Sequence, residues 1–277
     1  MKTVFLLGRN LGALGVVALL FFPMLAFAAP AGDPQGGTII PIGPASCNDM
    51  KLHNVMKPES PVGCERLRLI TFPYVGLDGR THNDGQIVVL DAVAEYVLQI
   101  FLKLRDMRFP IAKARLMNHY EGNDSASTAD NNTSSFNARK AVGSSSFSMH
   151  AYGLAIDLNP VQNPFATRSG STLTFRPAPG IEFANRFIDR PGKNARGGMA
   201  ESAIDVFADH GFVGWGGYWD NPIDYQHFEV SRNLVQQLAS LPFAQAQALF
   251  KQYVERYRAC RRTAAQDSQR SKCINDR

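Results

Sequence analysis

Apolar residues recur along the chain with two different periods. Residues 67–71 alternate between apolar and polar positions, and residues 87–90 are a second run typical of a strand. A segment rich in Gly, Asp and Asn at 76–85 separates the two runs, which predicts a hairpin. From Asp91, whose side chain can cap a helix, to Leu104 the spacing becomes the i, i+4, i+7 pattern of a helix with one buried face. Residues 243–257 repeat this helical spacing after Pro242, which suits a first turn.

The middle of the chain has less regular patterns. Residues 121–146 are rich in Asn, Asp, Ser and Thr and predict a long loop, and residues 160–198 predict an insertion with little regular structure. Between them, residues 154–158 alternate as a strand, which places Asp157 on the face opposite the core. The remaining predicted elements are a strand at 111–117, a helix at 200–209, a turn at 211–219 and a short strand at 227–230.

The two ends of the chain lie outside this pattern. Residues 1–28 have a positively charged start, an apolar run of about a dozen residues and a small-x-small site, so they are interpreted as a secretory signal peptide. An uncleaved anchor is the alternative, although about 20 apolar residues are needed to span a bilayer. Residues 29–46 are predicted to be a flexible lead-in and residues 259–277 a basic tail, which leaves one domain at 47–258.

Composition narrows the class of protein. The 277 residues include 29 Lys and Arg and 24 Asp and Glu, a net charge of +5, and 45% of the residues are hydrophobic. A disordered chain is therefore excluded, and so modest a charge does not imply a nucleic-acid partner. Export favours disulfides over metal binding for the four cysteines, and the short loops Cys47 to Cys64 and Cys260 to Cys273 are the favoured pairings, although three connectivities are open.

Two segments carry candidate chemistry, Ser148–Asp157 and Asp224–Glu229. They contain His150, Asp157 and His227, and three ligands of these types with a fourth position left for water are typical of a catalytic zinc ion. The intervening Gly153 permits a sharp turn between the first two of these residues. The i, i+4 spacing of helical zinc-peptidase motifs is absent from both segments, so a geometry of loops and strands is expected.

These segments resemble the S-x-H-x-x-G-x-A-x-D and D/E-x-x-H signatures of VanY-type D-alanyl-D-alanine carboxypeptidases, VanX-type dipeptidases and L-alanyl-D-glutamate endopeptidases. Further blocks at 130–139, 157–164 and 215–229 are similar to the endopeptidase-like branch, and the resemblance covers about residues 65–235. It implies the α+β fold shared with hedgehog N-terminal domains, in which helices pack on a small antiparallel sheet.

The resemblance also implies a role for individual residues. Those expected at the site are the Zn²⁺ ligands His150, Asp157 and His227, the general base Asp224, the oxyanion-stabilising Arg139, and the substrate-binding residues Ser148 and Trp215. For Ser148 the alternative is a role in stabilising the turn, and for Trp215 it is a place in the core.

The expected function is that of an exported zinc peptidase, periplasmic or secreted, which hydrolyses an amide bond in the stem peptides of peptidoglycan. Two cleavage sites are considered: the bond that releases the terminal D-alanine, and an internal bond of the L-alanyl-D-glutamate type. An Asp at position 224 favours the endopeptidase-like branch. The alternative is a non-catalytic, zinc-containing module that binds the cell wall. A monomer is expected, without stable membrane insertion once the signal peptide is cleaved.

Overall fold

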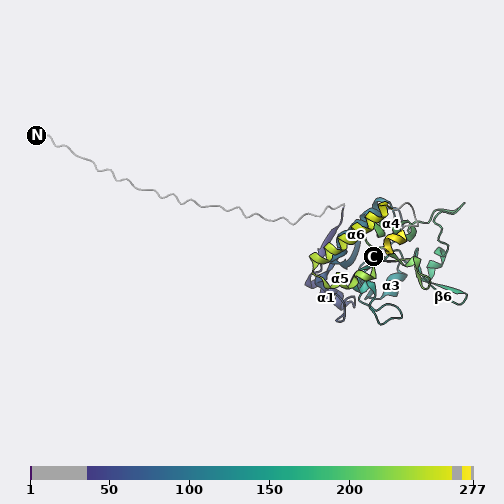
Figure 1. Cartoon of the computed structure of the whole chain (residues 1–277), viewed down its shortest axis with the longest axis horizontal. Coiled ribbons are helices and arrows are strands. Elements are labelled where there is room, and N and C mark those ends of the chain that lie inside the picture. Colours follow the sequence, from purple (N-terminus) through teal and green to yellow (C-terminus); the bar gives the residue numbers. More distant parts are fainter. Residues whose placement is uncertain (2–35, 264–269, 276–277) are drawn as a thin grey trace. The chain divides into compact units, whose positions relative to one another are not determined.

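A computed structural model describes Met1, residues 36–263 and residues 270–275 of the chain (Figure 1). Apart from Met1, the predicted signal peptide lies outside the described residues, as do residues 29–35 of the predicted lead-in. None of the helices in the described ranges is long and apolar enough to cross a membrane.

The largest sheet is built around the predicted hairpin. Strands β2 (Leu67–Gly76) and β3 (Thr81–Leu90) pair in an antiparallel arrangement, and β4 (Pro110–Ile111) pairs with β2 in parallel. Helix α2 (Ala94–Asp106) covers this sheet with the apolar stripe that its sequence predicts, and the rings of Phe72 and Phe101 stack with centroids 3.8 Å apart. Mixed helices and small, mainly antiparallel sheets confirm the α+β class.

Asp91 does not cap helix α2. The chain forms a short 3₁₀ turn at Asp91–Val93 before the helix, and the buried Asp91 carboxylate instead accepts two hydrogen bonds from one edge of the Arg66 guanidinium, from Nε at 2.7 Å and from Nη2 at 2.9 Å. Arg66 also donates to two backbone carbonyls near residue 239, so this ion pair ties the hairpin to the C-terminal helices.

The predicted lead-in is structured from residue 38 onward, which corrects that expectation. Strand β1 (Thr38–Pro41) pairs with β2 at the edge of the sheet, and helix α1 (Pro44–Leu52) begins inside the same segment. Strand β1 is held by backbone hydrogen bonds at the sheet edge, which do not depend on its side chains. Its sequence therefore need not show the alternation of apolar and polar residues from which strands are predicted. The boundary expected at residue 47 therefore falls within α1.

Two further sheets are formed by the second half of the chain. One has the order β5 (Ala155–Asp157), β10 (His227–Glu229), β8 (Gly214–Trp215), and the other β7 (Thr172–Arg176), β6 (Phe165–Ser169), β9 (Ile223–Asp224). The expectation of little regular structure at 160–198 was wrong for the β6–β7 hairpin. Most of its exposed residues are polar, although Leu173 is also exposed, and Thr167 and Thr174 are hydrogen bonded across the strands, so the hairpin lacks the alternation of a half-buried one.

Other predicted elements are shorter than expected. The strand expected at 111–117 is reduced to β4, and a 3₁₀ turn occupies Met117–Tyr120. Helix α3 (Asp124–Ala129) lies in the predicted loop, where the Asn123 side chain accepts a hydrogen bond from Ala126 N. The helix expected at 200–209 is divided into a 3₁₀ turn at Ala200–Ser202 and helix α4 (Ile204–Asp209).

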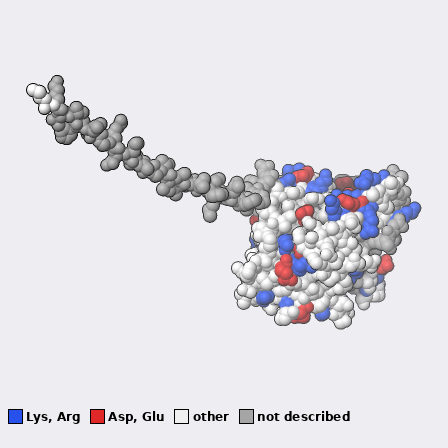
Figure 2. Space-filling model, turned by 60° about the vertical axis from the view of Figure 1, so that its left-hand side comes forward, with Lys and Arg blue, Asp and Glu red and all other residues white. Residues whose placement is uncertain are grey.

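The C-terminal part is helical. Helices α5 (Val235–Ser240) and α6 (Phe243–Thr263) follow β10, and α6 buries the stripe Ala246, Phe250, Tyr253, Val254 and Tyr257. Because α6 continues past residue 258 and helix α7 (Arg270–Asn275) follows, the segment expected as a basic tail is partly helical. On the face drawn in Figure 2, basic and acidic side chains are interspersed among uncharged ones, which agrees with a charged fraction of 19%.

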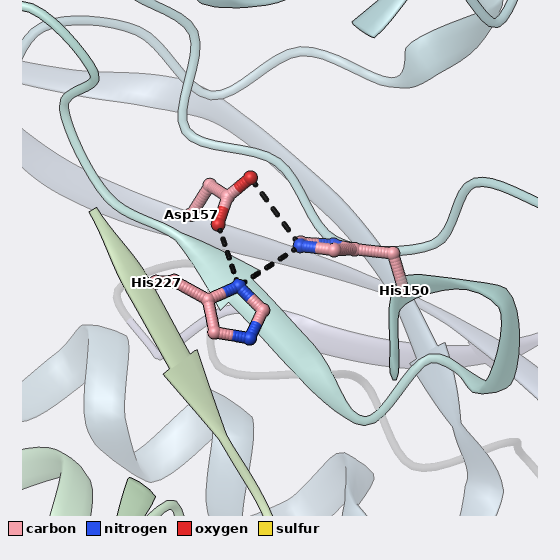
Figure 3. A group of neighbouring side chains, drawn as sticks. All are labelled: His150, Asp157 and His227. Carbon is pink, nitrogen blue, oxygen red and sulfur yellow. Dashed lines mark hydrogen bonds and ion pairs between the residues drawn. The ribbon is translucent and has the colours of Figure 1, made fainter. Parts of the chain in front are cut away.

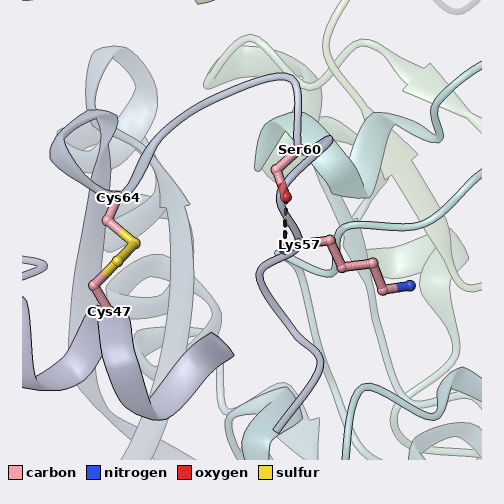
Figure 4. The surroundings of a disulfide bond; sticks show 4 residues. All are labelled: Cys47, Lys57, Ser60 and Cys64. Atoms are coloured by element: carbon pink, nitrogen blue, oxygen red, sulfur yellow. Dashed lines mark hydrogen bonds between the residues drawn. A yellow bond between two sulfur atoms is a disulfide. The ribbon is translucent and has the colours of Figure 1, made fainter. Parts of the chain in front are cut away.

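Two disulfides close the ends of the fold. They join Cys47 of α1 to Cys64 (Figure 4) and Cys260 of α6 to Cys273 of α7, which are the pairings that the sequence favoured. The first bridge closes a loop in which the hydroxyl of Ser60 accepts a hydrogen bond from Lys57 N at 2.8 Å. It thereby links helix α1 to the segment just before β2.

Removal of the Cys47–Cys64 bridge should destabilise the protein. The loop spans 17 residues of sequence separation, so the double substitution Cys47→Ala/Cys64→Ala is expected to lower the free energy of unfolding by about 3 kcal/mol. Urea denaturation under non-reducing conditions measures the change. An unchanged midpoint would show that this bridge does not constrain the unfolded chain.

Candidate metal centre

The first candidate ligand, His150, lies in a tight turn. A 3₁₀ turn at Met149–Tyr152 begins after Ser148, whose hydroxyl accepts a hydrogen bond from His150 N at 3.3 Å. It ends at Gly153 in the left-handed conformation, with φ of +67°. A Cβ atom at this position would lie 2.6 Å from Leu90 N, so only glycine lets the turn pack against the end of β3.

The other two candidate ligands face each other on neighbouring strands. Asp157 ends β5, His227 begins β10, and the two residues are directly paired in the antiparallel register. Directly opposed side chains project from the same face of a sheet, so this pairing brings the carboxylate and the imidazole together. Asp157 also exchanges two backbone hydrogen bonds with Ser134, which covers the other edge of β5.

The three side chains converge on one point (Figure 3). His150 Nε2 lies 3.3 Å from Asp157 Oδ2, His227 Nδ1 lies 3.1 Å from Asp157 Oδ1, and the two nitrogens are 3.3 Å apart. All three residues are buried, with exposed fractions of 2%, 4% and 6%. Asp157 is thus in the interior, whereas the sequence pattern placed it on the face away from the core.

Hydrogen bonds on the far side of each ring determine which nitrogen faces the centre. His150 Nδ1 lies 2.7 Å from the carbonyl oxygen of Ser135, which can only accept, so Nδ1 donates. His227 Nε2 donates in the same way to Glu229 Oε2 at 2.9 Å, and Arg232 fixes that carboxylate through two further contacts at 2.8 and 2.9 Å. In the neutral rings, both facing nitrogens therefore carry lone pairs.

This donor set fits a zinc ion. Two neutral imidazole nitrogens and a carboxylate would present lone pairs to one another at separations of 3.1–3.3 Å, a repulsive arrangement unless a cation or a proton lies between them. Tetrahedral coordination with bonds of about 2.1 Å places neighbouring ligand atoms about 3.4 Å apart, close to these separations. Among the described residues, His150, Asp157 and His227 form a group whose ligand atoms are close enough together to hold a metal ion.

In the metal-free protein, a proton on the His227 ring offsets part of the negative charge of Asp157. Burial raises the pKa of Asp157, but the charges and hydrogen bonds of His150 and His227 lower it by more, so the carboxylate is ionised. Burial lowers the pKa of His227, yet hydrogen bonds to Asp157 and Glu229 outweigh this and raise it to about 10. Metal binding must therefore displace a proton from His227, which couples metal affinity to pH.

Asp224 is held close to this centre on the other small sheet. It ends β9 and pairs with Phe165 of β6, and a Cβ atom on the neighbouring Gly216 would lie 2.5 Å from its carbonyl oxygen. Its Oδ1 atom is buried without a hydrogen-bond partner in the described structure. Burial, followed by the negative charge of Asp157, raises the pKa of Asp224 to about 7.

Arg139 lies beside the first ligand. Its carbonyl oxygen accepts a hydrogen bond from Ser148 N, and its guanidinium pairs with Asp124 Oδ1 of helix α3 at 3.1 Å. The Asp124 charge in turn contributes to the raised pKa of Asp224, so this ion pair lies within electrostatic reach of the candidate base.

The two residues expected to bind substrate have structural partners. The Ser148 hydroxyl accepts the His150 N–H, as a turn-stabilising residue would. Trp215 is buried, its indole N–H donates to the Tyr225 carbonyl at 2.8 Å, and its ring packs near Phe228. These contacts favour the turn and core alternatives for Ser148 and Trp215.

The supporting groups around the ligands were missed by sequence reasoning. Glu229 lies two residues after His227 on β10, hence on the same strand face, and this spacing could have identified it. The carbonyl of Ser135 carries no side-chain signal. Gln226, whose side chain hydrogen bonds to the Asp224 carboxylate, lies in the quoted segment but in a position without a periodic pattern.

Comparison with known proteins gives one finding. Residues 142–230 match the family model described as D-alanyl-D-alanine carboxypeptidase, and this match supports the VanY-type zinc peptidase family. The matched segment contains all three candidate ligands and Asp224. No curated protein and no solved structure matches the chain.

Substitution Gly153→Ala should disturb the candidate metal centre. The left-handed backbone costs about 1–3 kcal/mol for a residue with a side chain, and the contact with Leu90 N adds to that cost. Reduced stability in urea and weaker zinc binding, measured by competition with a coloured chelator, are expected. Gly170→Ala is the matched control, because Gly170 has φ of +58° but open space at its Cβ position. Equal effects at both positions would contradict the close-packing argument.

Asp224→Asn should stabilise the metal-free protein at alkaline pH. The pKa of Asp224 is raised from 3.8 to about 7 by burial, so the cost of its buried charge is absent below pH 3.8 and complete above pH 7. Asn cannot ionise, and the variant should therefore melt at a higher temperature than wild type at pH 8 but not at pH 3.5.

Thermal unfolding in the presence of a chelator tests this difference. Asp220→Asn changes an exposed carboxylate and should leave the melting temperature nearly unchanged at both pH values. An Asp224→Asn protein that gains no stability at pH 8 would contradict a raised pKa.

Proposed function

We propose that the chain is an exported zinc peptidase that hydrolyses an amide bond in peptidoglycan stem peptides, with metal ligands His150, Asp157 and His227. The observation that carries this proposal is the convergence of three buried lone-pair donors, close to a carboxylate with one buried oxygen that has no hydrogen-bond partner. The family match over residues 142–230 supports the same chemistry. Export is supported by the N-terminal pattern and by two disulfides.

Asp224 is suited to move protons. Zinc, when bound, lowers the pKa of a coordinated water to about 7 and polarises the scissile carbonyl. A carboxylate with a pKa near neutrality could accept a proton from the attacking water and later give it to the leaving amine. Its unpartnered Oδ1 is free for this transfer, while the Gln226 side chain holds the carboxylate through a hydrogen bond.

Arg139 is proposed to stabilise the negative charge of the tetrahedral intermediate. The pairing with Asp124 orients its side chain, about a fifth of which is exposed, and its Nε atom is buried without a partner. A donor that acts on an oxyanion in a site of low dielectric contributes about 3–4 kcal/mol to the transition state.

The scissile bond is proposed to be the terminal D-alanyl-D-alanine amide. The description of the matching family favours it, whereas Asp in place of Glu at the base position favours an internal cut. Both bonds occur in a stem pentapeptide, so one substrate distinguishes them.

A zinc-containing module that only binds the wall is the alternative. Such a module has no use for a carboxylate with a buried, unpaired oxygen, because Asp224 costs stability whenever it is ionised. A structural zinc ion also takes four protein ligands, whereas three converge here. Both observations favour an enzyme.

The test is digestion of the pentapeptide L-Ala-γ-D-Glu-L-Lys-D-Ala-D-Ala, followed by mass spectrometry. Release of one alanine from the carboxyl end is expected, with about one zinc ion per chain by elemental analysis. Asp224→Asn should lower kcat by at least about a hundredfold, a fall typical for loss of a positioned general base, and retain zinc.

Zinc binding without cleavage of the pentapeptide or of purified muropeptides would overturn the proposed enzyme. Full activity in His150→Ala would contradict the ligand assignment. Cleavage between L-alanine and D-glutamate would keep the peptidase but replace the proposed bond.

A further inference from the structure

The candidate base and the candidate ligands stand on different sheets. Asp224 ends β9, which pairs with β6 of the insertion, whereas His227 begins β10, which pairs with β5. Tyr225 and Gln226 alone connect the two strands. The distance between base and metal centre therefore depends on how firmly this two-residue connection is held.

A guanidinium from the insertion lies over the ring of Tyr225. Arg186 Cζ is 4.3 Å from the ring centroid, well inside the range of a cation–π contact. Two hydrogen bonds also hold Tyr225. Trp215 Nε1 donates to the Tyr225 carbonyl oxygen at 2.8 Å, and Tyr225 N donates to Pro164 O at 3.4 Å.

Arg186 is itself immobilised by a full set of hydrogen bonds. Nε and Nη2 form a bidentate pair with Glu201, both at 2.7 Å. Nη1 donates to the carbonyls of Gln162 and Phe183, and Nη2 donates to Asn163 Oδ1 at 2.9 Å. All five N–H groups of a guanidinium are thus used, and its plane is fixed.

The same network reaches the strand that carries Asp157. The Asn163 amide donates to Leu158 O and to Gly198 O, both at 2.9 Å, and its oxygen also accepts from Ala200 N. Leu158 directly follows Asp157. Arg186 therefore connects two segments of the site. Through Asn163 it reaches Leu158, beside the candidate ligand Asp157, and it contacts Tyr225, beside the candidate base Asp224.

We infer that Arg186 is a positioning residue, which sets the placement of Asp224 relative to the metal centre by clamping Tyr225. The inference rests on the proposed function for its effect on catalysis. A lysine at position 186 could not reproduce these contacts, because an ammonium group has three donors and no planar face to stack on a ring.

Substitution Arg186→Met tests the clamp. A misplacement of about 1 Å can cost about a hundredfold in rate, so kcat on the pentapeptide should fall by about tenfold to a hundredfold while KM and zinc content stay near wild type. Amide hydrogen exchange over residues 222–226 should accelerate in the zinc-loaded protein, whereas exchange in helix α2 should not. Arg186→Lys keeps the charge beside Glu201 and should show the same loss.

The partner ring gives a second, independent measurement. Tyr225→Leu removes the face on which the guanidinium lies and should lower kcat as Arg186→Met does, and the double variant should lose little more than either single one. Tyr225→Phe keeps the ring and should restore most of the lost rate. Simple additivity of the two single changes would overturn the inference.

Arg196→Met is the matched control. Arg196 belongs to the same insertion and lies over the ring of Phe183, 5.4 Å from its centroid, but does not touch Tyr225. Its removal should leave kcat unchanged.

Wild-type kcat and unchanged exchange at 222–226 in Arg186→Met would contradict the clamp. If the wild-type protein cleaves no stem peptide, the proposed function fails, and the exchange measurement alone still decides whether Arg186 holds this segment.

Discussion

A buried carboxylate between two imidazoles is the constraint on which the second half of the fold depends. Ionised Asp157 is stable in the interior because His150 and His227 surround it, and each ring is oriented by an acceptor on its far side. Those acceptors are a backbone carbonyl and a carboxylate that is itself paired with Arg232. The strand pairing, the tight turn and the loop before it are thus all required to bring three donors to one point.

Asp224, the candidate base, must meet a different requirement. A carboxylate that exchanges protons near neutral pH must be buried enough to have a raised pKa and must keep one oxygen without a partner. Placing Asp224 on its own short strand separates it from the hydrogen bonds that hold the ligands. The consequence is that its position relies on β6, on Gly216 and on the segment around Tyr225, which lie outside the sheet of the ligands.

The spacing of apolar residues predicts those helices and strands that bury one face against the core. The β2–β3 hairpin, helices α2 and α6, and the strands that carry Asp157 and His227 follow from apolar spacing, and the α+β class followed from the resemblance. Strand β1 and the β6–β7 hairpin could not be predicted in this way, because edge strands and polar hairpins pair through the backbone. The burial of Asp157 and the contacts of Arg186 depend on residues distant in sequence, which no periodicity encodes.

The surroundings of the candidate metal centre contain polar atoms that the fold leaves without hydrogen-bond partners. Among the described residues, Asn137 Oδ1, Arg139 Nε and Gln226 Oε1 are buried without hydrogen-bond partners, as is Asp224 Oδ1. Each such atom costs about 1–3 kcal/mol, so a fold selected for stability alone would remove them. The Asn159 and Asn163 amides nearby, by contrast, use both their donors and their acceptors on the backbone. The unsatisfied atoms are thus concentrated beside a rigid, fully bonded frame, where stability alone gives no reason to keep them.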